Sequence, residues 1–379
     1  MAQPVPLAVA AALAAALAAA VWAQGPRMVA LAAIGVLLGA TLYLSSFGFA
    51  SAYRRLLEGR GVRAVQAQIL MLAAATVLFA PVLAHGDWFG REVVGAIAPA
   101  GVQVAAGAFL FGIGMQLAGG CGSGTLYAAG GGQLRMAVTL AMFCAGSFWA
   151  SLDMEFWGRL PAPQPVALGE FAGWPAAVAI QLALLAALYK LAGRLPGAAA
   201  DARPRLATNP QRIWRGPWPL AAGALILAVL NLLTLIVAGH PWSITWAFAL
   251  WGAKTARTLG WQPGTDGFWS ADFQRDALDA SVFADITSVM DFGIVAGAFA
   301  AASIAGGFRP RLGPSLGAVI AAALGGLAMG YGARIAFGCN VGAFFSGVAS
   351  TSLHGWLWIA AALPGSWAGL RLLRLFAAR

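Results

Sequence analysis

Apolar segments of helix length alternate with short polar connections along almost the whole chain. About 20 apolar residues in a helix cross the roughly 30 Å hydrocarbon core of a bilayer, so the pattern predicts repeated membrane crossings. Several segments are short or interrupted by glycine, and we expect these to enter the bilayer without crossing it. The expected helical segments are Val5–Ala23, Met28–Phe49, Val65–Ala84, Gly101–Ala118, Leu134–Leu152, Trp174–Leu191, Leu220–Ala238, Ser243–Leu259, Ile286–Gly307, Leu316–Ala336 and Leu353–Phe376.

The composition supports the same class of protein. Of the 379 residues, 60% are hydrophobic and only 9% are charged, whereas a soluble domain carries about 25% charged residues. The first apolar segment lacks a preceding basic region and is long for the core of a signal peptide, so we expect a retained helix. The chain is therefore predicted to be an all-α, multi-pass integral membrane protein.

The charged residues predict how the chain is oriented. The formal net charge is +10, but the basic side chains lie in short connections between apolar segments, which argues against nucleic-acid binding. Arginine and lysine collect in cytoplasmic loops, so we expect both termini and residues 194–219 on the cytoplasmic side of the membrane. The Asp-rich stretch Asp266–Asp285 is expected outside. The arginines that support this orientation are Arg54, Arg55, Arg60, Arg63, Arg194, Arg203, Arg205, Arg212, Arg215, Arg371, Arg374 and Arg379.

Cysteine and histidine usage bears on metal sites. The chain has three cysteines and three scattered histidines, without a CxxC motif or a Cys–His cluster. Zinc and haem sites need such clusters. Neither a metal nor a cofactor is expected.

An internal repeat is the most informative feature of the sequence. With a shift of 218 positions, the segment from Gly107 falls on the segment from Gly325 without a gap. Two of the three cysteines, Cys121 and Cys339, come into register, and Cys144 aligns with an alanine. The other identical pairs are Gly107 and Gly325, Gly112 and Gly330, Gly114 and Gly332, Ala118 and Ala336, Gly120 and Gly338, Gly124 and Gly342, and Trp149 and Trp367.

The repeat predicts two pseudo-symmetric halves, residues 1–193 and 220–379, joined by a proline- and arginine-rich cytoplasmic linker at 194–219. We expect each half to contain membrane-spanning helices and shorter helices that enter the bilayer without crossing it. A pseudo-two-fold axis in the membrane plane would place the two repeated cysteines near each other at its centre.

Glycine-interrupted segments at corresponding positions of two halves are typical of a transporter's binding site. Irregular backbone at membrane depth is tolerated where it faces protein or a watery cavity, and the glycines around Cys121 are poor helix formers. A helix beginning after Gly124 or Gly342 would direct its positive end at a solute beside the cysteine, which favours an anion. The predicted path residues are Gln116, Gly120, Cys121, Gly122, Ser123, Gly124, Thr125, Arg334, Gly338, Cys339, Asn340 and Gly342.

Structural explanations exist for the same residues. Small residues let transmembrane helices pack closely, and a buried cysteine often behaves as a small hydrophobe, which is how we interpret Cys144. The in-register position of Cys121 and Cys339 inside a glycine break favours function for that pair. Arg334, in register with Gln116, marks either a substrate path or a side chain that reaches the membrane interface.

The segments Gly112–Tyr127 and Tyr331–Gly347 closely resemble the two signature segments of the YeeE/YedE sulphur-transport family. The similarity extends to Gly48–Arg55, Asp285–Gly297 and Ser352–Trp367. The resemblance implies an inner-membrane importer of thiosulfate or a related sulphur-containing anion, shaped like an hourglass with short helices meeting at its constriction.

By the same resemblance, Cys121 and Cys339 would line the constriction and offer S–H hydrogen bonds to the anion. A small cytoplasmic TusA-like sulphur-carrier protein is the implied partner. Importers of this family have a third path cysteine after a phenylalanine, but here Phe47 is followed by Gly48. Ser45 and Ser46 lie nearby as weaker hydrogen-bond donors.

Two further functions remain open from the sequence. A membrane thiol or persulfide redox enzyme would use Cys121 and Cys339 as redox partners, although such pairs usually lie close in sequence. A non-transporting membrane subunit that recruits a sulphur carrier would need neither cysteine. The chain carries no Walker motif, so ATP hydrolysis by this chain is not expected to drive transport.

Overall fold

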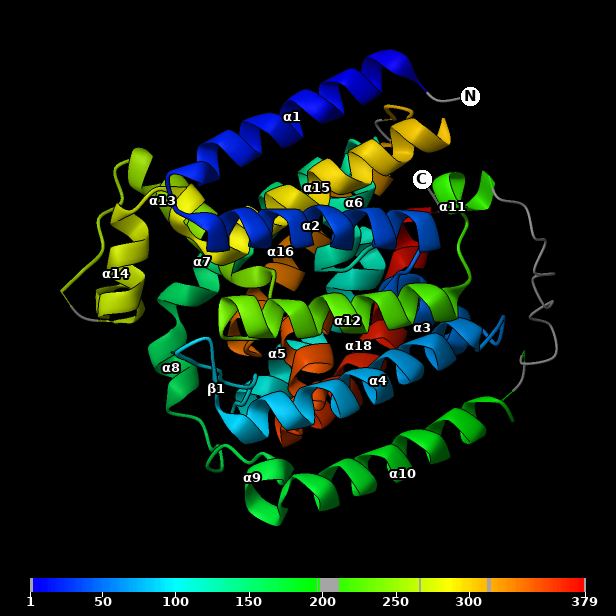
Figure 1. Cartoon of the computed structure of the whole chain (residues 1–379), viewed down its shortest axis with the longest axis vertical. Coiled ribbons are helices and arrows are strands. Elements are labelled where there is room, and N and C mark those ends of the chain that lie inside the picture. Colours follow the sequence, from blue (N-terminus) through cyan, green and yellow to red (C-terminus); the bar gives the residue numbers. More distant parts are fainter. Residues whose placement is uncertain (1–2, 196, 198–210, 266, 312–314, 378–379) are drawn as a thin grey trace.

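The computed structural model describes residues 3–195, 197, 211–265, 267–311 and 315–377. Within them the protein is a bundle of helices running roughly side by side (Figure 1). The sole described sheet is a two-stranded hairpin, β1 (Asp87–Trp88) and β2 (Arg91–Glu92), in which Asp87 pairs with Glu92. The structure therefore shows the expected all-α fold.

The helices up to residue 192 are α1 (Pro4–Trp22), α2 (Pro26–Ser45), α3 (Phe49–Leu57), α4 (Arg63–His85), α5 (Val102–Ala118), α6 (Gly122–Gly130), α7 (Arg135–Leu152), α8 (Met154–Gly158), α9 (Leu168–Ala172) and α10 (Trp174–Ala192). The later helices are α11 (Gln211–Arg215), α12 (Leu220–Ala238), α13 (Thr245–Thr258), α14 (Asp272–Asp279), α15 (Ile286–Ala305), α16 (Leu316–Ile335), α17 (Ser346–Ala349) and α18 (Leu353–Ala377). Two 3₁₀ turns, η1 (Phe268–Ser270) and η2 (Val282–Ala284), and a π-helix, η3 (Asn340–Phe345), complete the described elements.

Nine helical stretches in the described parts of the chain are long and apolar enough to cross a membrane. They agree with the expected segments except at two places. Helix α13 has 14 residues, which at 1.5 Å per residue is too short for the hydrocarbon core. Helix α18 has 25 residues but does not reach the same hydropathy. Three of the nine stretches combine two or more helices across a break, so interrupted helices are a recurring feature of this bundle.

Helices α5 and α16 cross at the centre with their backbones in contact. A Cβ on Gly107 would lie 2.6 Å from the carbonyl oxygen of Gly332, and one on Gly114 would lie 2.5 Å from that of Gly325. Small residues allow such close crossings between membrane helices. Gly325 and Gly332 are the repeat equivalents of Gly107 and Gly114. Exchanging the two halves therefore turns the first contact into the second, as a two-fold relation between α5 and α16 requires.

The surrounding helices pair in the same reciprocal manner. Helix α7 packs on α16 while α18, its counterpart in the repeat, packs on α5. Helix α2 packs on α15 as α12 packs on α4, and the outermost helices follow, α1 on α15 and α10 on α4. Figure 1 shows α1 and α10 at opposite edges of the bundle.

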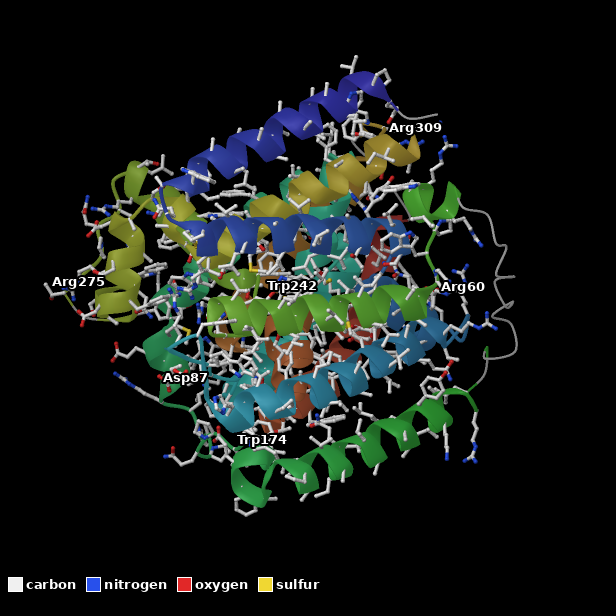
Figure 2. The ribbon with its side chains drawn as sticks, in the orientation of Figure 1. Arg60, Asp87, Trp174, Trp242, Arg275 and Arg309 are labelled. Carbon is white, nitrogen blue, oxygen red and sulfur yellow. The ribbon has the colours of Figure 1, made fainter. Side chains whose placement is uncertain are left out.

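Charge separates the two ends of the bundle. The start of α1, the end of α18 and α11 lie at one end, here called the basic end, with Arg60 and Arg309 (Figures 1 and 2). Asp87, α8 and α14, which carries Asp272, Asp276 and Asp279, lie at the other end together with Arg275. We call it the acidic end. Of the residues used to predict orientation, Arg203, Arg205, Asp266 and Arg379 fall outside the described residues.

Candidate functional site

The first interrupted helix breaks at the glycines before Cys121. Gly119 ends α5 in the left-handed conformation (φ +78°), and Cys121 is extended and precedes the first residue of α6. Helix α6 therefore begins at Gly122, earlier than the expected start after Gly124. The glycine cost that motivated the later start applies to helix interiors, whereas Gly122 and Gly124 occupy the first turn.

The second interrupted helix breaks at the repeat-equivalent positions. Phe337 is left-handed (φ +59°), Gly338 has φ +144°, and Cys339 is extended. A Cβ on Gly338 would lie 2.7 Å from the backbone nitrogen of Ala343, so glycine is required there. The following helix begins at Asn340, again earlier than expected after Gly342, and its first part is the π-helix η3. Single π turns occur frequently at functional sites.

The two breaks meet in the interior. A Cβ on Gly122 would lie 3.4 Å from Cys339 Sγ, so the two cysteines flank one small region. Cys121 Sγ lies 3.4 Å from Ser123 Oγ, and the backbone N–H of Val341 donates to Cys339 Sγ at 3.5 Å. Both thiols are free and no more than 1% exposed.

The region flanked by Cys121 and Cys339 is here called the cysteine centre. Two helical segments, α6 and the segment formed by η3 and α17, start there and run in opposite directions. Beyond the end of α6, Gln133 pairs with Arg311 near the basic end, whereas beyond α17 the Ser350 hydroxyl accepts from Ala96 after the hairpin at the acidic end. The first N–H groups of a helix have no partner inside the helix, and its start carries about half a positive charge. Both starts therefore favour an anion between them.

Buried polar atoms without partners lie in both segments. Thr125 Oγ1 and Asn340 Oδ1 have no hydrogen-bond partner among the described residues, and both residues are fully buried. The Asn340 amide donates only to Met115 Sδ, at 3.3 Å. Buried polar groups are usually satisfied, so these atoms are available to a ligand.

The structure separates Gln116 and Arg334, which are in register in the repeat. The Gln116 side chain donates from Nε2 to Ala50 O at 3.1 Å, and the backbone carbonyl oxygen of Gln116 accepts from Arg54 Nη2 at 3.1 Å. The Arg334 guanidinium instead lies 4.8 Å from the Phe268 ring centre, in the connection at the acidic end. One arginine therefore contacts the first interrupted helix, and a second, Arg334, lies within the other interrupted helix toward the acidic end.

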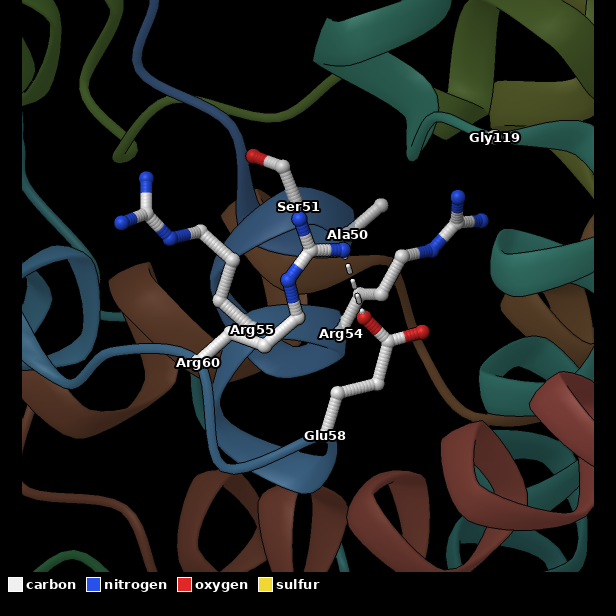
Figure 3. Close-up of a pocket in the computed structure, with 7 residues that line it drawn as sticks. All are labelled: Ala50, Ser51, Arg54, Arg55, Glu58, Arg60 and Gly119. Carbon is white, nitrogen blue, oxygen red and sulfur yellow. Dashed lines mark hydrogen bonds and ion pairs between the residues drawn. The ribbon is translucent and has the colours of Figure 1, made fainter. Parts of the chain in front are cut away.

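A basic pocket of about 330 Å³ opens beside the first break (Figure 3). Arg54, Arg55 and Arg60 surround it, and Arg60 is paired with Glu58 at 3.3 Å. Gly119 lines its inner side, two residues before Cys121. The sequence indicated these arginines only as markers of orientation, because the contact between α3 and the Gly119 turn joins segments more than 60 residues apart.

An outer pocket of about 440 Å³ approaches from the acidic end, lined by His240, Ser243, Asp276, Asp285 and Thr287 among others. A Cβ on Gly342 would lie 3.3 Å from Ser243 Oγ, so this pocket reaches the second break. Burial lowers the pKa of His240, which favours its neutral form. Sequence reasoning missed Ser243, whose only signal was its place after a Trp at the start of the expected segment Ser243–Leu259.

Gly48, which replaces the cysteine expected from the resemblance, lies near the basic pocket. A Cβ there would lie 2.9 Å from Ser51 Oγ and 3.4 Å from Tyr127 Oη of α6. The hydroxyl of Ser45, expected as a substitute donor, donates within its own helix to Thr41 O at 2.6 Å. Ser51, which lines the basic pocket, is the hydroxyl closest to Gly48.

Comparison with known proteins agrees with a transport function. A family model described as "Sulphur transport" matches residues 44–368. The "Thiosulfate transporter TsuA" of Spirochaeta thermophila is 27% identical over 350 residues, 88% of this chain and 95% of that protein. The "Probable transporter YedE" of Escherichia coli K12 is 32% identical, and that of Salmonella typhimurium 31% identical, each over 158 residues. These matches cover 42% of this chain and 38% of each YedE protein. The family and the relatives' names point to transport rather than catalysis.

Proposed function

Because the chain belongs to the Sulphur transport family, we propose that it carries a small sulphur-containing anion, thiosulfate first, inward across a bacterial inner membrane. The observation that supports this most strongly is the meeting of the two interrupted helices. Cys339 Sγ lies against Gly122, and two helical segments begin there and run apart. The homologous thiosulfate transporter makes thiosulfate the first substrate to test.

The chemistry of the cysteine centre suits such an anion. Each helix start contributes roughly half a positive charge, which compensates for part of the cost of bringing an anion into the bilayer. The two thiols are weak donors and polarizable, so they match a terminal sulphur better than hydroxyls do. Thr125 and Asn340 add polar atoms without partners.

The two pockets define the proposed route. The anion enters the outer pocket, passes Ser243 and Gly342, and reaches Cys339. It then crosses Gly122 to Cys121 and leaves past Gly119 into the basic pocket. Three arginines at the exit attract anions at long range, so the basic pocket acts as a collecting site on the receiving side.

Orientation and partner follow from the same charge distribution. We place the basic end in the cytoplasm, since arginine excess marks cytoplasmic loops. A C-terminal reporter active only outside the cytoplasm would contradict this placement. A small TusA-like sulphur carrier is proposed to dock at the basic end and receive the sulphur. Binding of such a carrier to the purified transporter should weaken when Arg60 is replaced by Glu.

The decisive experiment is uptake of labelled thiosulfate by proteoliposomes containing cysteine variants. Cys121→Ala and Cys339→Ala should each abolish uptake with little change in melting temperature, since each removes one small group. Cys144→Ala is the matched control and should retain parental uptake. Serine at the two path positions tests the sulphur itself, because a hydroxyl donates a hydrogen bond but is less polarizable.

The same variants separate the competing functions. Full uptake by the double alanine variant would contradict the cysteine path. A redox enzyme would instead require stable oxidation of the two thiols during turnover, which thiol counting measures. A non-transporting subunit would give no uptake in the parent protein and unchanged carrier binding in both cysteine variants.

A further inference from the structure

Helix α15 carries a buried carboxyl group that the proposed path does not use. Asp291 is 0% exposed, and neither of its carboxyl oxygens has a hydrogen-bond partner among the described residues. A charge held within a membrane-spanning helix costs several kcal/mol, and ionisable residues in such positions usually serve transport. A proton is the simplest partner that removes this cost.

The surroundings of Asp291 supply no compensating cation within the described residues. Among the ionisable groups that interact electrostatically with it are Asp285, which immediately precedes its helix, Cys144 of α7, and Cys339, which immediately precedes η3. The cationic groups on helices packed against α15 are engaged elsewhere or lie at its basic end. Arg27 donates to the Val237 and Ala238 carbonyls, Lys254 to the Leu278 and Ala280 carbonyls, Arg257 pairs with Asp279, and Arg212 and Arg215 belong to α11.

The position of Asp291 links the outer pocket to the cysteine centre. Thr287 lines the outer pocket, and Asp291 follows it by four residues, one turn deeper on the same helix face. Ser243 of the same pocket lies beside Gly342 of the second break, where a Cβ on Gly342 would be 3.3 Å from Ser243 Oγ. A proton that enters the outer pocket therefore meets this carboxyl one helix turn beyond Thr287, on the side from which the anion approaches the second break.

We propose that Asp291 is the proton-binding site that couples anion entry to proton entry, an inference that rests on the proposed transport function. As a carboxylate, Asp291 repels an anion arriving at Cys339. Binding of one proton from the outer pocket converts the carboxylate to a neutral carboxyl and removes this repulsion. Anion and proton then favour each other's binding to the same extent, as linkage requires. Release of the proton on the cytoplasmic side returns the carboxylate, and no bond other than O–H forms or breaks.

The test uses the purified full chain in proteoliposomes with labelled thiosulfate and an internal pH-sensitive dye. In the parent, an inward proton gradient should raise the initial uptake rate at least tenfold, and protons should enter together with the anion. Asp291→Asn should lose this response but retain thiosulfate exchange at equal concentrations and equal pH. Asp291→Glu should recover part of the response. Asp272→Asn, which changes an exposed carboxyl of α14 that lines neither pocket, is the matched control and should behave as the parent.

Several results would overturn the inference. Parental uptake that ignores the proton gradient, or that requires sodium instead, excludes proton coupling while leaving thiosulfate transport intact. A folded Asp291→Asn variant that keeps the gradient response excludes Asp291 as the site, and one that loses exchange as well makes Asp291 part of the anion path. If Asp291→Asn does not fold, the inference is overturned when the parent shows no proton entry with the anion, or when Asp291→Glu responds to the gradient as the parent does. A parent without any thiosulfate uptake contradicts the proposed function itself.

Discussion

The two interrupted helices make the same turn with different residues. At repeat-equivalent positions, Gly119 has φ +78° and Phe337 has φ +59°. The left-handed conformation is free of steric cost for glycine but costs roughly 1–2 kcal/mol for other residues. The second break also requires Gly338 and continues as a π-helix, whereas α6 is a regular helix. The break nearer the outer pocket is thus tightly constrained, and the one nearer the basic pocket is permissive.

The polar groups at the two ends differ more than the backbones. The basic pocket beside the first break has Arg54, Arg55 and Arg60, whereas the outer pocket has Asp276 and Asp285. In the proposed mechanism, the symmetric backbone provides one anion site at the centre, and the asymmetric charges make one exit more attractive to an anion than the other. Side chains placed on a pseudo-symmetric backbone can thus set the direction of transport.

The largest expected effect comes from filling the shared centre. Gly122→Leu would place a bulky side chain against Cys339, Ile244 and Phe143, so labelled uptake should fall at least a hundredfold. Overpacking of this kind destabilises a protein by about 1–3 kcal/mol. In Gly122→Ala the Cβ makes only ordinary contacts, so the loss of uptake should be smaller. Gly158→Leu, at a glycine with open space around it, is the control. Unchanged uptake by Gly122→Leu would remove this region from the path.

A smaller effect is expected from the arginines of the two ends. Arg54→Gln removes a charge that lines the basic pocket and should lower uptake about tenfold, with a reduced dependence on ionic strength. Arg334→Gln should lower it about threefold, because Arg334 packs on Phe268 and lines neither pocket. Arg159→Gln, an exposed residue paired with Glu155, should have no effect. Equal losses of uptake in the Arg54→Gln and Arg334→Gln variants would contradict the proposed difference between the two ends.

The smallest effect tests the two turns. Gly119→Ala should destabilise the protein by about 1 kcal/mol, since alanine pays the left-handed cost while its Cβ meets only the flexible Arg135 side chain at 3.2 Å. Melting in detergent should fall by a few degrees with uptake retained. Gly338→Ala should cost more, because its Cβ meets backbone. The reverse order would show that the first break is the constrained one.

Much of this arrangement could be predicted from the sequence. Apolar segment length predicted most of the helices, and the 218-residue register predicted that Cys121 and Cys339 lie in equivalent breaks. The helix starts were misjudged by a few residues, because glycine is penalised in helix interiors but not in a first turn. The Arg54–Gln116 contact, Ser243 beside Gly342 and the isolation of Asp291 could not be predicted, since each depends on how distant helices pack.

The packing of the outer helices suggests a second way to divide the chain into halves. Composition favoured residues 194–219, but α10 packs on α4 as α1 packs on α15. We propose that α10 is the first helix of the second half, so that the boundary lies within residues 153–173. Residues 194–219 would then be a long connection inside the second half. Separate expression of fragments cut in either place, followed by reassembly, would distinguish the two divisions.

The backbone contact between α5 and α16 limits how the protein can move. Where Gly107 meets Gly332 and Gly114 meets Gly325, the two backbones are in direct contact and leave no room for a side chain at these four positions. Rocking one half against the other would separate both crossings at once. We therefore expect the transport cycle to use small local shifts around the cysteines, and the turnover rate to change little with bilayer thickness or lateral tension.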